Sequence, residues 1–547
     1  MGRDLPFSLL LFIVAACCAP GAAWSPIRIK YILSKDNLQI DQEQMLTLTK
    51  QLMPQAIGIW QDILRVDALR HPLFLPRTCR VSFVNDTTQC AISCHEALAP
   101  RYEKCGEAVI SPMHHDELEV CKSATVVDGV TKWTGCKTLG RAEDGGVKQT
   151  DFLIYTQAIQ TDDCAIPGRK NGALAWASTC HIDPQSERPI SGFINICPSI
   201  LPRYKEDGDL TEQLTTVVHE IGHALGFTST LMALWRDESN KPRTKRDQCG
   251  IPPILKYTNF QVMLPGNETL HFPDPSNFKR ALVVTPKVKQ VAREFFACDT
   301  LTGVPLENQS PYPMWGAHWE ERVLGTELMS GTLNSVVKGE PLSPLTLALF
   351  EDTGWYQANY DSEFVSRPSW GLAQGCLFLQ SACITDGGPI AHPFCITSGQ
   401  SGCSSDLRSV AECNLQRHTQ RVPEQFRYFD DPYLGGEWSM ADYCPFYGPQ
   451  NRVLCSQTPD TDLDTLEMFG EEDVACFEVV GSLSTPERKL YQTSTTAGCF
   501  RYTCESDHAI VHLANGDQAR CDQEYQTTTL STVNASIKCP NLLVLCP

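Results

Sequence analysis

The residues best suited to chemistry lie in one short segment, HEIGH, at positions 219–223. His219 and His223 are four residues apart, so on a helix they lie one turn apart on the same face. Two imidazoles placed in this way can both bind one metal ion, and zinc–nitrogen distances are usually ~2.0–2.1 Å. Glu220 projects about a quarter-turn away from them, where it can reach a water on the metal. The pattern predicts a zinc site in which Glu220 is the general base.

Gly226 supports this interpretation of a motif that also arises by chance. HExxH is short, and a helix can carry two exposed histidines without any metal. Gly226 follows His223 at the spacing where metzincin peptidases turn their chain out of the active-site helix. Glycine suits that turn because it tolerates positive φ at the end of a helix.

The third metal ligand does not follow from the motif. Catalytic zinc usually has three protein ligands and a water, and the usual metzincin position for the third histidine holds Ser229. His318 lies in the segment GAHWEERVLGTELMSG, where Met329 follows eleven residues later. A methionine turn is a metzincin feature. The downstream candidates are His271, His318, His392, His418, His508 and His512.

These segments closely resemble the leishmanolysin (M8) family of zinc metallopeptidases, and most of all its animal leishmanolysin-like members. The matching segments are HEIGHALGF, AHWEERVLGTELMSG, GALAWASTC, LALFEDTGWYQANY and DYCPF. In this family an inserted domain separates the helix from the third histidine. The resemblance therefore implies catalysis by Glu220 and a turn at Met329. It implies one zinc ion bound by His219, His223 and His318.

The resemblance also implies the fold and its division into domains. The expected class is α+β, with a metzincin-type catalytic domain, a central inserted domain and a C-terminal disulfide-rich domain of strands and loops. Cys298 and Cys376 are expected to pair, which would close the insert and leave an even number of cysteines on each side of residue 378. The expected segments are a signal peptide at 1–23, the catalytic domain at 24–228, the central domain at 229–378 and the C-terminal domain at 379–547.

Hydrophobic patterns predict the elements that position these residues. Residues 209–230 predict the active-site helix, with Asp209 as its cap and Glu212 completing a capping box. Apolar residues at intervals of three and four predict a helix over 41–66, kinked at Pro54. Strands are predicted over 26–33, 151–156, 192–196 and 172–178, the last as an edge strand beside the substrate.

The N-terminus and the cysteines indicate an extracellular protein. Residues 9–16 are apolar and small residues precede a cut before Trp24, which is typical of a secretory signal peptide. Cys17 and Cys18 leave with that peptide, so 24 of the 26 cysteines remain, and extensive disulfide pairing is expected. Retention at the cell surface would require a partner protein. Glycosylation sequons begin at Asn85, Asn267, Asn308 and Asn534.

Charge and hydropathy limit the partners. The formal net charge of −19 argues against nucleic acid or anionic lipid as a partner. No later segment approaches the ~20 apolar residues of a membrane-spanning helix. We therefore expect a monomer that acts on proteins or peptides, with no membrane span. The run KPRTKR at 241–246 is similar to a proprotein-convertase site, although an exposed basic loop is the favoured interpretation.

Three other functions remain open at this point. The first is an adhesion or binding protein that keeps a zinc fold without catalysis, against which the intact Glu220 argues. The second is a gluzincin-type peptidase with a downstream glutamate, such as Glu238, as the third ligand; Gly226 and Met329 disfavour it. The third is a zinc hydrolase for a non-peptide substrate, which only the family resemblance disfavours.

Overall fold

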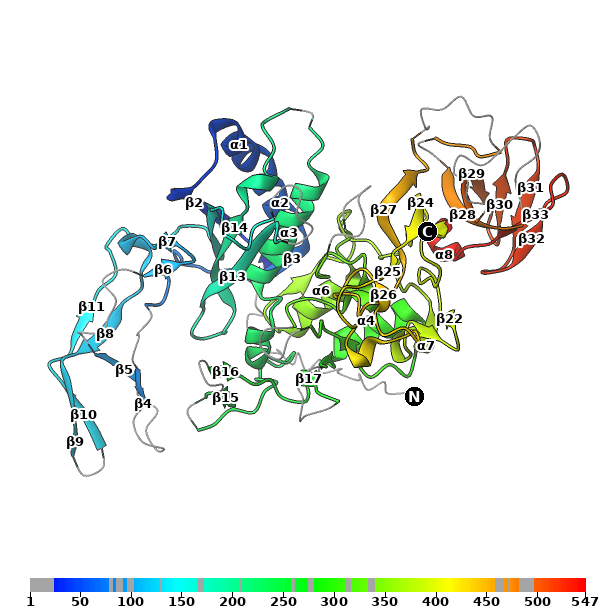
Figure 1. Cartoon of the computed structure of the whole chain (residues 1–547). Coiled ribbons are helices and arrows are strands. Elements are labelled where there is room, and N and C mark those ends of the chain that lie inside the picture. Colours follow the sequence, from blue (N-terminus) through cyan, green and yellow to red (C-terminus); the bar gives the residue numbers. More distant parts are fainter. Residues whose placement is uncertain are drawn as a thin grey trace, which may run out of the picture.

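The structure is a computed structural model, shown in Figure 1. The predicted signal peptide and Asn85 lie outside the residues that it describes. The described part of the chain mixes helices and strands, as expected, and none of its helices is long and apolar enough to cross a membrane. The described residues are 24–77, 82–84, 92–95, 103–127, 130–165, 172–206, 208–248, 250–256, 261–273, 280–309, 316–332, 340–457, 466–470, 473–481 and 496–547.

A four-stranded sheet in the order β13-β14-β12-β2 forms the base of the N-terminal part. The strands β2 (Ile29–Leu38), β12 (Phe152–Ala158) and β14 (Pro189–Ile196) are parallel, and β13 (Ala175–Ile182) is antiparallel at one edge. Every residue of β12 is buried, as in parallel sheets covered on both faces. The four predicted strands are therefore present, with ends shifted by a few residues.

Helices cover one face of this sheet, and the hairpin at 104–109, at the root of a β-rich arm, packs on the other. The long helix α3 (Thr211–Leu225) packs on β13 and β14, and α2 (Met53–Ile63) packs on α3. Figure 1 shows the arm projecting at the opposite end of the molecule from the C-terminal sheet. The arm strands are β4 (Ser82–Val84), β5 (Ile92–His95), β6 (Lys104–Cys105), β7 (Ala108–Val109), β8 (Leu118–Cys121), β9 (Ser123–Val127), β10 (Val130–Thr134) and β11 (Lys137–Leu139).

The helix predicted over 41–66 is shorter and less regular than expected. It consists of α1 (Gln42–Leu46), a π-helical stretch at Thr47–Leu52 and then α2, near whose start Pro54 lies. The segment Leu64–Asp67 forms strand β3 between β1 (Trp24–Pro26) and β20 (Gln357–Ala358). The apolar side chains at the end of the predicted helix are thus buried by strand pairing instead of by a further helical turn.

The predicted capping box of α3 is wrong. The helix begins at Thr211 after Leu210, whose side chain provides no cap. Asp209 instead accepts a hydrogen bond from the backbone N–H of Thr211 at 3.0 Å. Such a local bond two residues along the chain satisfies one free N–H, and the Glu212 N–H forms no bond to this carboxylate.

The central part of the chain shares its core with both neighbouring parts. One buried apolar cluster runs from Ile27 to Phe446 and includes Phe378, so it continues across the predicted boundary at 378. Cys298 and Cys376 are bonded to each other. The elements here are β15 (Ile254–Lys256), β16 (Gln261–Met263), β17 (Leu270–His271), β18 (Leu282–Val283), α4 (Pro286–Phe296), β19 (Val304–Pro305), α5 (Glu321–Leu324), α6 (Pro344–Asp352) and α7 (Gly375–Gln380).

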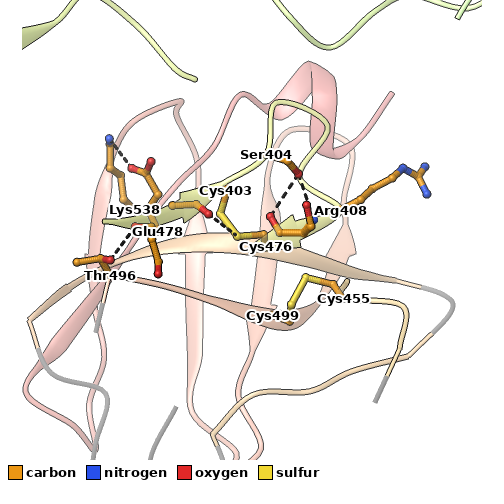
Figure 2. The surroundings of a disulfide bond; sticks show 12 residues. Cys403, Ser404, Arg408, Cys455, Cys476, Glu478, Thr496, Cys499 and Lys538 are labelled. Atoms are coloured by element: carbon orange, nitrogen blue, oxygen red, sulfur yellow. Dashed lines mark hydrogen bonds and ion pairs between the residues drawn. A yellow bond between two sulfur atoms is a disulfide. The ribbon is translucent and has the colours of Figure 1, made fainter. Parts of the chain in front are cut away.

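The C-terminal part is built on a six-stranded sheet with its own apolar cluster. The Cys403–Cys476 bond joins β23 to β28, beside the Cys455–Cys499 bond (Figure 2). The strands are β21 (Ile384–Thr385), β22 (Gly388–Pro389), β23 (Ser401–Cys403), β24 (Ser409–Cys413), β25 (Leu415–Arg417), β26 (Leu434–Gly436), β27 (Tyr447–Leu454), β28 (Val474–Gly481), β29 (Ala497–Cys504), β30 (Ala509–His512), β31 (Gln518–Cys521), β32 (Thr527–Thr529) and β33 (Ala535–Lys538), followed by helix α8 (Leu542–Leu545).

The expected disulfide pairing is confirmed by ten bonds between described cysteines. None of these bonds crosses residue 378, so each side pairs internally. The bonds are Cys105–Cys180, Cys121–Cys136, Cys164–Cys197, Cys298–Cys376, Cys383–Cys444, Cys395–Cys413, Cys403–Cys476, Cys455–Cys499, Cys504–Cys546 and Cys521–Cys539.

The basic run at 241–246 is only in part the exposed loop that we favoured: Lys241 and Lys245 are exposed, but the two arginines are not. The side chains of Arg243 and Arg246 are only 7% and 10% exposed. Arg243 donates to the backbone carbonyl of Asp352 at 3.0 Å, and Arg246 pairs with Glu187 at 3.0 Å. These guanidinium groups tie the segment to the body of the protein, which also hides them from a convertase.

A buried carboxylate joins three segments at the base of the sheet. Asp151 is fully buried and accepts from the Arg28 side chain at 2.8 Å through both of its oxygens. It also accepts from the backbone N–H of Leu69 at 2.8 Å. Burial raises the pKa of Asp151, but the hydrogen bonds from Arg28 and Leu69 outweigh that effect and hold the pKa below its ordinary value.

Replacement of Asp151 should therefore destabilise the fold in a pH-dependent way. Asp151→Asn should lower the free energy of unfolding by about 2 kcal/mol at neutral pH. Because the native pKa is the lower one, the carboxylate stabilises the fold above the unfolded pKa of ~3.9, and that contribution is lost as pH falls through the native pKa. Denaturant unfolding at pH 7 and pH 3 measures both effects. The exposed Asp67→Asn is the control, and equal stabilities of the two variants would contradict the assignment.

Candidate metal centre

Helix α3 is fixed in place by side chains from three directions. Trp60 donates its indole N–H to the Val218 carbonyl at 2.9 Å. The Thr179 hydroxyl on β13 donates to the Ala224 carbonyl at 2.9 Å, and the Tyr356 hydroxyl donates to the Leu225 carbonyl at 2.8 Å. These bonds leave the helix little freedom to rotate or slide on the sheet.

Three imidazoles converge beside this helix. The Nε2 atoms of His219 and His223 lie 2.9 Å apart, and the Nε2 atom of His318 lies 3.2 Å from each of them. Tetrahedral bonds of ~2.0–2.1 Å to a zinc ion place the ligand atoms about 3.3 Å apart, which is close to this spacing. The structure thus brings His318 to the helix histidines, and we call these three residues the histidine triad.

None of the other candidates joins the histidine triad. Glu238, the possible gluzincin ligand, pairs instead with Arg243 at 3.2 Å. Elsewhere among the described residues, one further group of three ligand-type side chains contains Cys121 and Cys136, which are bonded to each other. The described part of the chain therefore offers one site of the kind that the motif predicts.

Hydrogen bonds of the three Nδ1 atoms determine the orientation of the imidazole rings. His219 Nδ1 lies 2.5 Å from the Leu328 carbonyl, and His223 Nδ1 lies 2.8 Å from the Phe227 carbonyl. His318 Nδ1 lies 2.8 Å from Oε2 of Glu307. Because these oxygens only accept, each Nδ1 donates, and the Nε2 lone pairs face one another. Three converging lone pairs repel one another unless a cation lies between them, so this donor set fits a metal ion.

Burial and charge set the protonation of the triad. Burial lowers the pKa of His219 to about 3, and burial together with the nearby His219 lowers the pKa of His223 well below its ordinary value. For His318, burial also lowers the pKa, but the attraction and hydrogen bond of Glu307 outweigh it and the pKa is raised. Two of the three imidazoles are therefore neutral, the form that can bind a metal, and the third is made more basic by a carboxylate.

Glu220 is buried beside the triad and is not one of its ligands. Glu220 is only 6% exposed, and its Oε2 atom has no hydrogen-bond partner among the described residues. Burial raises the pKa of Glu220 to about 8. A buried carboxylate oxygen without a donor is well placed to accept a proton from a small molecule at the site.

Met329 lies directly under α3. It is fully buried, and a Cβ atom added to Gly222 would lie only 2.8 Å from its Sδ atom. The Met329 N–H donates to Glu327 at 2.5 Å, and its carbonyl accepts from the Trp319 N–H at 2.9 Å. Glycine at 222 therefore provides the space that the methionine occupies.

Gly226 ends α3 with a φ of 127°, which side chains with a Cβ rarely adopt. A Cβ atom there would also approach the Trp355 ring to 3.2 Å. The turn directs the Phe227 carbonyl back toward His223 Nδ1. This glycine thus helps to fix the orientation of a triad member as well as to end the helix.

Sequence reasoning missed two buried glutamates at the site. Glu307 orients His318, and Glu327 accepts from the Ser343 hydroxyl at 2.6 Å as well as from Met329. Neither glutamate lies at a helical or motif spacing from the residue it holds, so no local pattern points to its role. Only the convergence of distant segments identifies both.

The predicted glycosylation sites differ in accessibility. Asn267 and Asn534 are exposed in turns. Asn308 is partly buried, and its Nδ2 atom donates to Glu320 at 2.7 Å. A glycan on Asn308 would replace this bond, so the first two positions suit a glycan better.

Comparison with known proteins identifies similar chains. A sequence model of the family described as leishmanolysin matches residues 112–547. A leishmanolysin-like peptidase of Caenorhabditis elegans is 32% identical over 580 residues, which cover 95% of this chain and 83% of the relative. One from Drosophila melanogaster is 29% identical over 544 residues, covering 90% and 76%. The mouse ciliated left-right organizer metallopeptidase is 28% identical over 364 residues, covering 63% and 44%.

The position of Glu307 predicts that it strengthens metal binding. Glu307→Gln removes the negative charge that orients His318 and should weaken zinc affinity by roughly 10–100-fold. Competition with a chromophoric chelator measures that affinity. The control is Glu294→Gln on the exposed face of α4, which should change nothing. An unchanged affinity in the Glu307 variant would show that the carboxylate does not act through His318.

Proposed function

The chain belongs to the leishmanolysin family, a family of zinc metalloendopeptidases, and we propose that it hydrolyses peptide bonds in proteins at the histidine triad. One zinc ion would be held by His219, His223 and His318. The observation that carries the proposal is the convergence of three Nε2 atoms, 2.9–3.2 Å apart, beside the unpartnered oxygen of Glu220.

The proposed reaction uses Glu220 twice. A bound zinc ion supplies a Lewis acid that lowers the pKa of a water molecule and polarises the peptide carbonyl. Glu220 accepts a proton from the attacking water as the new C–O bond forms. It then donates that proton to the amine nitrogen as the C–N bond breaks. The burial that raises the pKa of Glu220 favours this temporary protonation.

Strand β13 is the proposed support for an extended substrate. It lies at the edge of the sheet and contacts α3, to which Thr179 is hydrogen-bonded. The backbone groups on the open side of an edge strand can pair with another chain. A polypeptide aligned along β13 would pass the histidine triad in a regular conformation.

The setting of the activity is also part of the proposal. The many disulfides suit an oxidising compartment, and we propose a secreted monomer released by a cut after Ala23. In this proposal a metzincin-type catalytic domain ends at residue 228, a central domain at 378 and a disulfide-rich domain at 547. A partner protein would be needed to retain the enzyme at the cell surface.

Removal of the base should separate catalysis from metal binding. Glu220→Gln should lower the hydrolysis of casein by at least about 100-fold, because the water loses its proton acceptor. The zinc content should not change, since Glu220 is not a ligand. Turnover and zinc content are measured on the same preparation, with chelator-treated wild type as the control. Near-normal turnover of the zinc-loaded variant would contradict the role of Glu220.

Removal of the third ligand, unlike removal of Glu220, should weaken zinc binding. His318→Ala should weaken zinc affinity by more than about 100-fold, since two imidazoles and waters remain. The exposed His271→Ala on β17 is the matched control and should retain zinc. If Glu238→Ala removed the metal and His318→Ala did not, the gluzincin arrangement would be correct.

A further inference from the structure

Two arginines from the segment after α3 meet on one glutamate. Arg236 donates to Oε2 of Glu187 at 2.9 Å, and Arg246 donates to the same oxygen at 3.0 Å. Glu187 lies in the turn between β13 and β14. Arg246 is the last residue of the basic run KPRTKR, to which the proposed catalysis gives no role.

These three side chains are largely removed from water. The side chain of Arg246 is 10% exposed, and those of Arg236 and Glu187 are 16% and 17% exposed. Burial lowers the pKa of Arg246; the attraction of Glu187 opposes that effect, and the neighbouring Arg236 adds to it. A guanidinium keeps its charge at any ordinary pH, so two buried positive charges face one negative charge.

No further carboxylate balances this excess charge. Among the described residues, neither arginine has a second carboxylate within ion-pair distance. The other carboxylates of the two segments accept hydrogen bonds of their own; they are Asp183, Asp237, Glu238 and Asp247. The pair of Arg236 and Arg246 therefore carries one positive charge without a counter-charge.

Three N–H donors of the same two arginines are also unsatisfied. The Nε atom of Arg236 and the Nε and Nη1 atoms of Arg246 are buried, and they have no hydrogen-bond partner among the described residues. A buried donor on a charged group is destabilising without a partner, and most such groups in native proteins have one. Because both Nη2 atoms contact one oxygen, the two guanidinium groups are neighbours, and a single ion can lie close to both.

Charge and burial together define the missing partner. One monovalent anion neutralises the excess charge and accepts from N–H groups, whereas a water molecule accepts from them but leaves the charge. The donor atoms are buried, so the ligand has to give up most of its hydration. Chloride does so more easily than sulfate or phosphate, because the cost of removing an ion from water rises steeply with its charge.

The turn that carries Glu187 also contacts the region at the end of α3. The Ser186 carbonyl accepts from the indole N–H of Trp355 at 3.0 Å. The Trp355 ring lies beside Gly226, where a Cβ atom would approach it to 3.2 Å. An ion that joins this turn to the segment after α3 therefore stabilises the packing around the end of the helix.

We infer that Arg236 and Arg246 form a binding site for a chloride ion, which stabilises the junction between the β13–β14 turn and the segment after α3. The inference does not depend on the proposed peptidase function, since these side chains contribute neither a metal ligand nor the base. The ion completes the charge balance and the hydrogen bonds of an arginine pair that one glutamate leaves incomplete.

The test is thermal unfolding of the full-length chain at constant ionic strength, with chloride replaced stepwise by gluconate, a monovalent anion too large for a buried site. The wild-type midpoint should rise with chloride by about 2 °C and then saturate, because a ligand that binds only the native state stabilises it by mass action. Arg246→Met should remove this dependence, since Arg236 and Glu187 then form a balanced pair. Arg203→Gln, at a side chain that is 75% exposed, is the control and should keep the dependence.

Two further measurements make the outcome decisive. In gluconate, Arg246→Met should be at least as stable as wild type, because it lacks the uncompensated charge. In wild-type crystals grown with bromide, an anomalous peak should lie at Arg236 and Arg246, and this measurement needs no variant to fold. A wild-type midpoint that does not respond to chloride, a response that survives in Arg246→Met, or the absence of bromide from this pair would overturn the inference.

Discussion

The Nδ1 hydrogen bonds of the three histidines are the constraint on which the site depends. A metal site needs lone pairs that point at one place, and an imidazole can rotate about two bonds unless its other nitrogen is held. Here the Leu328 carbonyl holds His219, and Glu307 holds His318. Each acceptor comes from a different segment of the chain. The geometry of the site therefore depends on how precisely those segments pack together.

That packing follows from how α3 is enclosed. The sheet supports it from one side, Trp60 binds its backbone from another, and Met329 fills the space beside Gly222. Glu327 holds the methionine turn by accepting from Met329 and Ser343. A buried, fully hydrogen-bonded carboxylate of this kind gives a turn one defined conformation, because any other would leave polar groups unsatisfied.

The disulfides and the shared core make one assembly of segments that are far apart in sequence. The apolar cluster around α3 extends as far as Phe446, and the Cys298–Cys376 bond closes the chain between α4 and α7. The C-terminal sheet has a separate core, and segments next to it line a groove together with residues of α3. The same contacts that stabilise the fold therefore also shape the surface beside α3.

The sequence by itself determined what depends on local spacing, and the tertiary structure decided the rest. The pairing of His219 and His223 follows from helical periodicity, and runs rich in β-branched and aromatic residues located the strands of the sheet. The sequence could not identify Glu307 as the partner of His318, because the two residues are 11 positions apart and no motif links them. It also misplaced the cap of α3 and the end of α2, where hydrogen bonds and strand pairing overruled local preference. The periodicity of a sequence predicts which residues are neighbours within one helix or strand. The orientation of side chains at a site depends on atoms from distant segments that folding brings together.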